Sequence, residues 1–246
     1  MKILKSNVTK VVVTSLIFPV SMVILSFLLR NQRVNNDILQ IMVDLLVFLI
    51  AYLINWKYLH ENVSWIGTDT TIFQQLYTAL PAFIIIALLN SATLTAPDLT
   101  FKFKIVLTCL AIGLAEEYIC RGLLLGLALK LFHQNVLGAV LFSSVIFGSL
   151  HLTNLASLPI GYVAGQVIFA SAIGMLFGTV YVKTKSLWIV IGLHALRDMF
   201  PMFSPSLMKE AGQMQFSMIT LYTTIFMFVI AFIISYQQLK NFSVQK

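Results

Sequence analysis

The sequence has too little charge for a protein surrounded by water. Of its 246 residues, 10% are Asp, Glu, Lys or Arg, whereas 59% are hydrophobic. A soluble domain carries about 25% charged residues, so these charges cannot cover a water-facing surface. The mean hydropathy of +0.92 agrees with lipid as the main surroundings. No segment is polar enough to form a separate soluble domain, and we expect one membrane domain over residues 1–246.

Cysteine and clustered basic charge are also scarce. The two cysteines, Cys109 and Cys120, fall in one predicted helix. Their separation along that helix is about 16 Å, too far for a disulfide. The net charge is +7, but no basic patch is interleaved with aromatic residues, so nucleic acid is not an expected partner.

Two common protease signatures are missing. There is no Gly-x-Ser-x-Gly elbow around Ser143, Ser144 or Ser149, and we expect these serines to bond to helix backbone. There is also no His-Glu-x-x-His pair. The usual serine-hydrolase and zincin arrangements are therefore excluded.

Long apolar runs dominate what is present. A membrane helix needs about 20 mostly apolar residues, and the continuously apolar runs here do not alternate as barrel strands do. The sequence therefore predicts an all-α, polytopic membrane bundle of about eight transmembrane helices. The predicted helices are Val11–Leu29, Ile38–Ile54, Phe73–Leu89, Ile105–Leu131, Val136–Leu152, Tyr162–Val182, Leu187–Phe200 and Phe216–Tyr236.

The basic residues between these runs predict the orientation. Lys and Arg accumulate in cytoplasmic loops, and an inside N-terminus gives the more biased distribution. It places Lys2, Lys5, Lys10, Lys57, Lys130, Lys183, Lys185, Lys240 and Lys246 inside, and Arg30, Arg33, Lys102, Lys104 and Lys209 outside. We therefore expect both termini in the cytoplasm.

Some polar and small residues in the runs are assigned to packing alone. Asp44 follows Gln40 by one helical turn and is expected to be buried against another helix. Small residues four apart allow helices to approach closely. Two such steps occur in the sixth run, at Gly161, Gly165, Gly174 and Gly178.

The first of three polar clusters at membrane depth is Glu116-Glu117-x-x-x-Arg121, in the fourth run. Glu117 and Arg121 are four apart and can pair on one face, whereas Glu116 lies about 100° around the helix. A buried structural salt bridge explains Glu117 and Arg121 but not Glu116. An unpaired carboxylate in apolar surroundings is a stronger base than a surface carboxylate.

The other two clusters each contain a histidine. Phe147 and His151 share a face near the end of the fifth run, and His194 and Asp198 share a face in the seventh. A hydrogen-bonded pair or a satisfied core histidine explains either cluster alone. Arg197 is expected to point elsewhere and to extend toward an interface. Together the clusters supply a base, a group that orients water and donors for an oxyanion.

At these residues the chain resembles the CAAX-protease and bacteriocin-processing (CPBP, Abi) family. That family carries Glu-Glu-x-x-x-Arg, Phe-x-x-x-His and His-x-x-x-Asn/Asp motifs on separate helices. They stand here as Glu116-Glu117-x-x-x-Arg121, Phe147-x-x-x-His151 and His194-x-x-x-Asp198. The resemblance covers about residues 105–200.

The resemblance implies an eight-helix intramembrane endopeptidase with a polar cavity between the fourth, fifth and seventh helices. It assigns the general base to Glu116 and a water-holding role to His151. His194 and Asp198 would stabilise the oxyanion. Glu117 and Arg121 would shape the site, with Glu117 also a candidate to assist.

The resemblance leaves the metal open, because the family has been described both as metalloproteases and as metal-free glutamate proteases. Glu116, His151 and His194 could supply three zinc ligands with an open water position. The same side chains could also act without metal, and we favour the metal-free alternative.

The expected substrate is a membrane-associated peptide or protein. The Ile/Phe/Lys/Asn-leaning composition is typical of low-GC bacteria, and bacterial relatives are linked to bacteriocin self-immunity and peptide processing. We therefore expect a bacterial plasma-membrane protein whose partners are the lipid bilayer and a peptide, including a bacteriocin-related one. One alternative is a non-enzymatic bacteriocin-immunity or partner-binding protein that keeps the fold. The other is a small transporter, which the lack of an inverted repeat disfavours.

Overall fold

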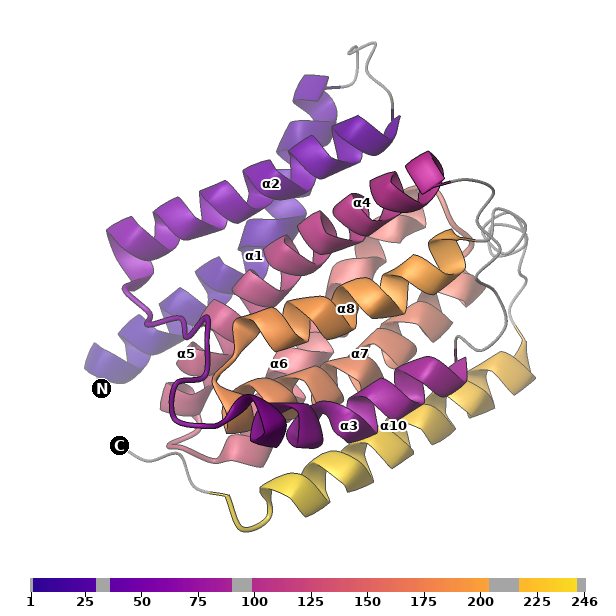
Figure 1. Ribbon diagram of the computed structural model, residues 1–246. Helices are drawn as coiled ribbons and strands as arrows, with labels where there is room; N and C mark the ends of the chain where they lie inside the picture. Colours follow the sequence, from indigo (N-terminus) through magenta and orange to yellow (C-terminus); the bar gives the residue numbers. More distant parts are fainter. Residues whose placement is uncertain (1, 30–35, 90–98, 204–216, 243–246) are drawn as a thin grey trace.

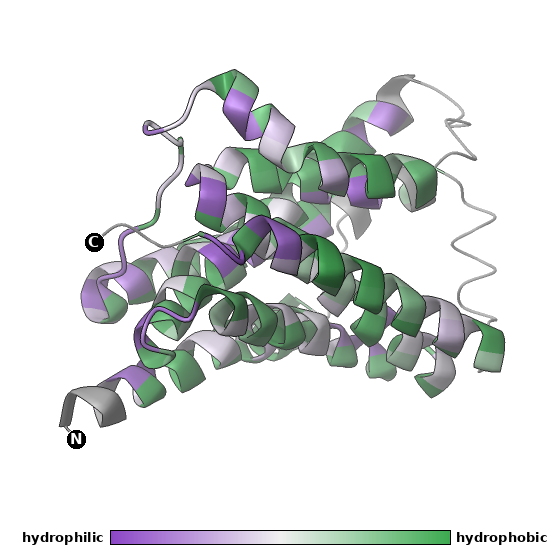
Figure 2. Ribbon diagram, turned by 90° about the horizontal axis from the view of Figure 1, so that it is seen from below, coloured by the Kyte–Doolittle hydropathy of each residue, from purple (hydrophilic) through white to green (hydrophobic). Residues whose placement is uncertain are grey.

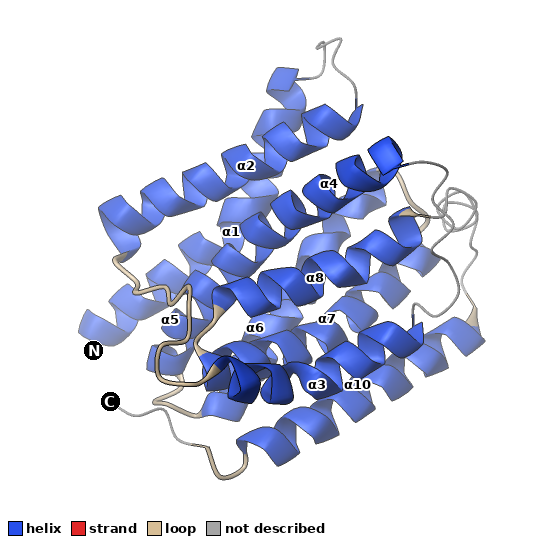
Figure 3. Cartoon of the chain, in the orientation of Figure 1, coloured by secondary structure: helices blue, strands red, loops and turns tan. Residues whose placement is uncertain are grey.

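The computed structural model describes residues 2–29, 36–89, 99–203 and 217–242. Within these ranges the chain is helical and has no strand, as Figure 3 shows. The expected all-α class is confirmed. The helices lie beside one another as a bundle in Figure 1.

The helix bounds follow the predicted apolar runs closely. The bundle consists of α1 (Lys2–Leu29), α2 (Asn36–Ile54), α3 (Ile72–Leu89), α4 (Leu99–Glu117), α5 (Leu125–Leu131), α6 (Val136–Leu150), α7 (Ile160–Thr184), α8 (Leu187–Met202) and α10 (Met218–Leu239). Shorter π or 3-10 segments are η1 (Asn55–Leu59), η2 (Tyr118–Leu124) and η3 (His151–Ala156). The long fourth run is α4, η2 and α5 in succession, with η2 a π-helix directly after the glutamate pair.

Among the described residues, six helices are long and apolar enough to cross a membrane. They are Ser6–Leu29, Ile38–Leu59, Ile72–Leu89, Val136–Ala156, Ile160–Thr184 and Met218–Leu239. The other two predicted spans carry polar clusters. The fourth run contains Glu116, Glu117 and Arg121 within one turn and a half, and α8 has only 16 residues. The two less apolar helices are therefore the ones that hold most of the polar site.

The outer surface of the bundle is apolar. Large hydrophobic side chains stand exposed on α1, α3 and α10, including Phe27, Phe73 and Ile219. Figure 2 shows hydrophobic residues along most of each helix. A soluble monomer rarely exposes so much contiguous apolar surface, whereas lipid accommodates it. The chain is therefore a membrane-embedded helical bundle.

The interior is formed where α7 packs on α6 and α10, and where α4 packs on α2 and α8. Glycine allows the α6–α7 contact to be close. A Cβ atom on Gly178 would lie 3.0 Å from Val140 Cγ1, and one on Gly174 would lie 3.1 Å from Ser144 Cα. The packing role predicted for these two glycines is confirmed. Cys109 and Cys120 are both free and buried, as expected.

The first turn of α1 and the last turn of α10 lie at the same end of the bundle in Figure 1. The two described ends of the chain therefore share one side of the bundle.

Candidate active site

The most buried part of the site is an ion pair between neighbouring turns of one helix. Arg121 Nη1 lies 2.9 Å from Glu117 Oε1, and both side chains are fully buried. Arg121 also donates from Nη2 to the Gly174 carbonyl, 3.2 Å away, and its Cζ stands 4.2 Å from the centre of the Phe147 ring. Arg121 thus connects the glutamate helix to α6 and α7.

His194 joins α8 to this pair. Its Nδ1 lies 2.7 Å from Glu117 Oε1, and its Nε2 lies 3.2 Å from Asp198 Oδ2. An imidazolium donates from both ring nitrogens and would satisfy both carboxylates. The i,i+4 partnership of His194 and Asp198 expected from their spacing is therefore present.

A glycine allows α8 to come this close to α4. A Cβ atom on Gly113 would lie 3.2 Å from the Ile191 carbonyl oxygen and 3.5 Å from His194 Cβ. A larger side chain at this position would push His194 away from the two glutamates. Gly113 on α4 therefore determines how close His194 comes to the two glutamates.

Glu116 differs from Glu117 in having no close partner. Its Oε2 is shielded from solvent and makes no hydrogen bond within the described part of the chain. The nearest basic atom printed for it is His194 Nε2, 3.9 Å away. The sequence-based expectation that Arg121 would pair with Glu117 and leave Glu116 free agrees with this geometry.

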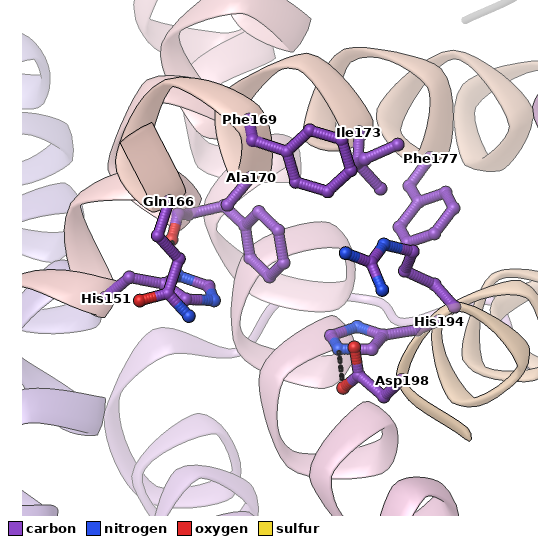
Figure 4. A pocket seen from close by; sticks show the side chains of 10 residues that line it. His151, Gln166, Phe169, Ala170, Ile173, Phe177, His194 and Asp198 are labelled. Atoms are coloured by element: carbon purple, nitrogen blue, oxygen red, sulfur yellow. Dashed lines mark hydrogen bonds and ion pairs between the residues drawn. The ribbon is translucent and has the colours of Figure 1, made fainter. Parts of the chain in front are cut away.

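A cavity of about 80 Å³ opens beside His194, well above the space that one water molecule needs. In Figure 4 His151 and Gln166 lie on one side of it, Phe169, Ile173 and Phe177 on another, and His194 with Asp198 below. The cavity is lined by Phe147, His151, Gln166, Phe169, Ala170, Ile173, Phe177, His194, Arg197 and Asp198. Aromatic and aliphatic walls with a few convergent polar groups are typical of a ligand site.

The six predicted residues thus form two adjoining layers. His151, His194 and Asp198 line the cavity, whereas Glu116, Glu117 and Arg121 are not among its lining residues. The glutamates reach the cavity wall through His194. His151 begins η3, and its Nδ1 lies 3.4 Å from the Phe147 carbonyl oxygen.

The expectation for Arg197 was wrong. Arg197 does not point away from the site but lines the same cavity as His194. Residues three apart lie on the same side of a helix, so the three-residue spacing from His194 to Arg197 could have indicated this position. Gln166 is a second lining residue that the sequence did not indicate.

Asp44 was assigned to packing, and its burial is confirmed because it is 1% exposed. Its Oδ2 accepts a hydrogen bond of 2.8 Å from Gln40 Nε2. It also interacts electrostatically with Glu116, His194 and Asp198. A third helix, α2, therefore adds a carboxylate to the surroundings of Glu116.

The serines are not arranged as nucleophiles. Ser144 donates to the Val140 carbonyl at 2.6 Å and Ser149 to the Val145 carbonyl at 2.8 Å. Ser143 donates to the Cys120 carbonyl of η2. These bonds to backbone are the ones expected from the sequence.

Zinc does not fit the present side-chain arrangement. Across the described ranges, no three His, Cys, Asp or Glu side chains are placed to hold a metal ion together. In the suggested set of Glu116, His151 and His194, both ring nitrogens of His194 already face carboxylates. No step proposed below passes through a metal.

Comparison with known proteins gives one family match. Residues 98–200 match the family described as type II CAAX prenyl endopeptidase, Rce1-like. No curated protein matches the chain. The matched range includes α4, η2, α5, α6, η3, α7 and most of α8, and therefore all six motif residues and every residue that lines the cavity. Residues 98–200 of this membrane protein are thus similar to the Rce1-like CAAX endopeptidases, a family of membrane proteases, in agreement with the resemblance carried by the three motifs.

Proposed function

We propose that the chain is an intramembrane endopeptidase that hydrolyses a peptide bond with a water molecule activated by Glu116. The substrate is a membrane-associated peptide or protein. The observation that carries this proposal is the contrast within the glutamate pair. Glu117 is bonded through Oε1 to Arg121 and His194 and leaves only Oε2 without a partner. Glu116, in contrast, has no hydrogen bond in the described part of the chain, and its Oε2 is buried.

Proton transfer follows from that contrast. The free Glu116 carboxylate takes a proton from water, and the water oxygen bonds to the carbonyl carbon of the peptide. A base in apolar surroundings performs this step better than a surface carboxylate. Glu116 then returns the proton to the amide nitrogen as the C–N bond breaks, leaving a carboxylic acid and an amine.

His194 is positioned to act on the carbonyl oxygen. It lies between Glu117 and Asp198 and lines the cavity. The N–H group at Nε2, which lies 3.2 Å from Asp198 Oδ2, would be shared with the carbonyl oxygen of the bound peptide and would stabilise the negative charge of the tetrahedral intermediate. Asp198 and Glu117 hold the ring in place, and His151 on the opposite wall helps to hold the attacking water.

The cellular setting is proposed from the family resemblance and the composition. We place the protein in a bacterial plasma membrane with both termini in the cytoplasm. We assign it a role in bacteriocin self-immunity or peptide processing. The helix ends that share one side of the bundle support the common placement of the termini.

The test is hydrolysis of membrane peptides by purified full-length protein in nanodiscs. We expect Glu116→Gln to reduce turnover by about 100- to 10,000-fold, the usual contribution of a general base. Glu61→Gln is the matched control. Glu61 has the same exposed fraction, 8%, but is bonded to Lys130 at 2.6 Å outside the cavity.

Parallel reactions with a zinc chelator separate the two mechanisms. Unchanged turnover after chelation supports the metal-free route, and loss that zinc restores supports the metal route. Undiminished turnover of folded Glu116→Gln would contradict the assigned base. If the unmodified protein cleaves no peptide but still confers immunity that Glu116→Gln retains, the non-enzymatic alternative is correct.

A further inference from the structure

We propose that Trp65, in the α2–α3 loop of residues 60–71, is a positioning residue that holds His194 at its distance from the glutamate pair. The loop lies outside residues 98–200, the range that matches the family. This inference deepens the proposed peptidase function. The turnover part of its test rests on that function, whereas the structural part does not.

The first reason is that the loop caps the helix that carries His194. Helix α8 begins at Leu187, and the first N–H groups of a helix have no partner within it. The N–H of Leu187 donates to the Ser64 carbonyl at 3.2 Å. The N–H of Trp188 donates to the Trp65 carbonyl at 3.3 Å. The loop thus holds the beginning of α8, about 9 Å along the helix from His194.

The second reason is that the side chain of Trp65 contacts the helix that carries the glutamates. Its ring stacks on Tyr118, with the ring centres 5.7 Å apart and an angle of 26° between the planes. Tyr118 directly follows Glu117 in the sequence and is buried. Its hydroxyl accepts a hydrogen bond of 3.2 Å from Asn55 Nδ2, which holds the ring in place. Trp65 therefore contacts one half of the site through its ring and the other half through its backbone.

The third reason is that the loop is itself held on both sides of Trp65. Before it, Asn55 Oδ1 accepts from the Glu61 N–H at 2.8 Å and Asn55 Nδ2 donates to the Glu61 carbonyl at 3.0 Å. After it, the Gly67 carbonyl accepts from Gln75 Nε2 at 2.6 Å, and a Cβ atom on Gly67 would collide with the backbone at the end of α7. Figure 3 shows the loop beside the beginning of α8. A loop fixed in this way cannot follow α8 if the helix shifts.

Two contacts therefore determine where His194 lies. Near the middle of α8, Gly113 allows the close approach to α4. At its beginning, the cap on Trp188 prevents the helix from pivoting about that single contact. The result is the 2.7 Å distance between His194 Nδ1 and Glu117 Oε1. A displacement of about 1 Å in a reactive group can reduce an enzyme's rate about 100-fold.

The experiment observes the contact between His194 and Glu117 directly. Full-length protein with isotopically labelled histidine is placed in nanodiscs and studied by NMR. The proton between His194 Nδ1 and Glu117 gives a signal far downfield, because the hydrogen bond is short and charge-assisted. The signal is assigned by its loss in His194→Gln. The unmodified protein is then compared with Trp65→Ala and Trp65→Phe.

We expect Trp65→Ala to move this signal upfield or abolish it, because α8 is then free to shift away from Glu117. Trp65→Phe should keep the signal close to its original position, since a phenylalanine ring still stacks on Tyr118. Trp56→Ala is the matched control and should change nothing. Trp56 is 61% exposed on η1, and its ring contact among the described residues is with Lys57.

Turnover of a membrane peptide tests the consequence for the chemistry. We expect kcat of Trp65→Ala to fall about 10- to 100-fold and that of Trp65→Phe to recover most of this loss. KM should stay within about two-fold, because Trp65 is not among the residues that line the cavity. A merely structural role would lower the melting temperature without moving the His194 signal.

An unmoved His194 signal in folded Trp65→Ala, or an equal change in Trp56→Ala, would overturn the proposal. Thermal unfolding of each variant shows whether it folds. If Trp65→Ala does not, Trp65→Leu decides the outcome, because leucine keeps apolar volume without a flat ring. If the signal moves but even the unmodified protein cleaves no peptide, the positioning role of Trp65 stands and the proposed function fails.

Discussion

Helices α7 and α10 pack against each other and are each long and apolar enough to cross a membrane, but their surroundings differ. In the most apolar 18-residue window, 72% of α7 is buried inside the protein and 11% of α10. Hydropathy alone cannot distinguish them, because lipid and protein interior are equally apolar. The difference lies in small residues: α7 has Gly174 and Gly178 where α6 approaches, whereas α10 exposes Ile219, Tyr222 and Phe226.

The largest expected effect comes from breaking the buried ion pair between Glu117 and Arg121. Arg121→Met leaves Glu117 with His194 as its remaining partner, and removing one partner of a buried pair costs about 3–5 kcal/mol. We expect a matching loss in the free energy of unfolding, measured by denaturation in detergent. Lys240→Met, at an exposed lysine beyond α10, should change it little.

A double variant sharpens this prediction. In Glu117→Met/Arg121→Met both charges are gone, so most of the stability should return while peptide cleavage stays lost. If the double variant is no more stable than Arg121→Met, the arginine acts through its contacts with Phe147 and Gly174 rather than through the glutamate.

A smaller effect is expected where α6 and α7 touch. A Cβ atom on Gly148 would meet Ser171 and the backbone of α7, so Gly148→Ala should cost about 1–3 kcal/mol through overpacking. Gly192→Ala is the matched control, because a Cβ atom there meets nothing within 4 Å. Equal melting temperatures for the two alanine variants would contradict this account of the α6–α7 contact.

A change at Asp44 tests whether α2 contributes to the activity of the site. Asp44→Asn keeps the size of the side chain but removes a negative charge from the electrostatic surroundings of Glu116 and His194. We expect turnover in nanodiscs to change while the free energy of unfolding stays the same. A loss of turnover that follows a loss of stability would instead indicate a packing role.

The smallest effect is expected on the lipid-facing side. Phe226 on α10 is 64% exposed, so Phe226→Ala exchanges contacts with lipid rather than with protein. We expect a change in unfolding free energy within about 0.5 kcal/mol and unchanged turnover. A loss as large as that of Gly148→Ala would show that another surface covers α10.

The helix positions and the contacts of the site also differ in how far the sequence predicted them. Helix positions followed from the apolar runs, because an apolar run of membrane length has helix as its usual structure. The pairing of Glu117 with Arg121 followed from i,i+4 spacing within one helix. The contact of Glu117 with His194 joins residues 77 apart and depends on how α8 packs on α4, which no local spacing encodes. The family resemblance brought these motifs together before the structure did.

Arg197 and Asp44 show what the sequence could not predict, which is the direction in which a single polar side chain faces. Each is a single polar residue in an apolar run, and the same pattern arises when such a residue reaches an interface or packs against a neighbour. Helix rotation decides between these outcomes, and it is set by many small contacts. Here it turns Arg197 into the cavity and Asp44 toward the electrostatic surroundings of Glu116.

The π-helical segment η2 determines how the helix that bears the glutamates is rotated about its axis. All seven of its residues, Tyr118–Leu124, are buried, and each of its wider turns holds more residues than an α-turn. Residues before it and after it therefore keep an angular offset that a continuous α-helix would not have. Downstream, Lys130 anchors α5 through Glu61 at 2.6 Å. Deleting one residue between Glu117 and Lys130 would rotate the carboxylates by about 100° relative to the Lys130–Glu61 contact. The number of residues between them therefore determines the direction in which Glu116 faces.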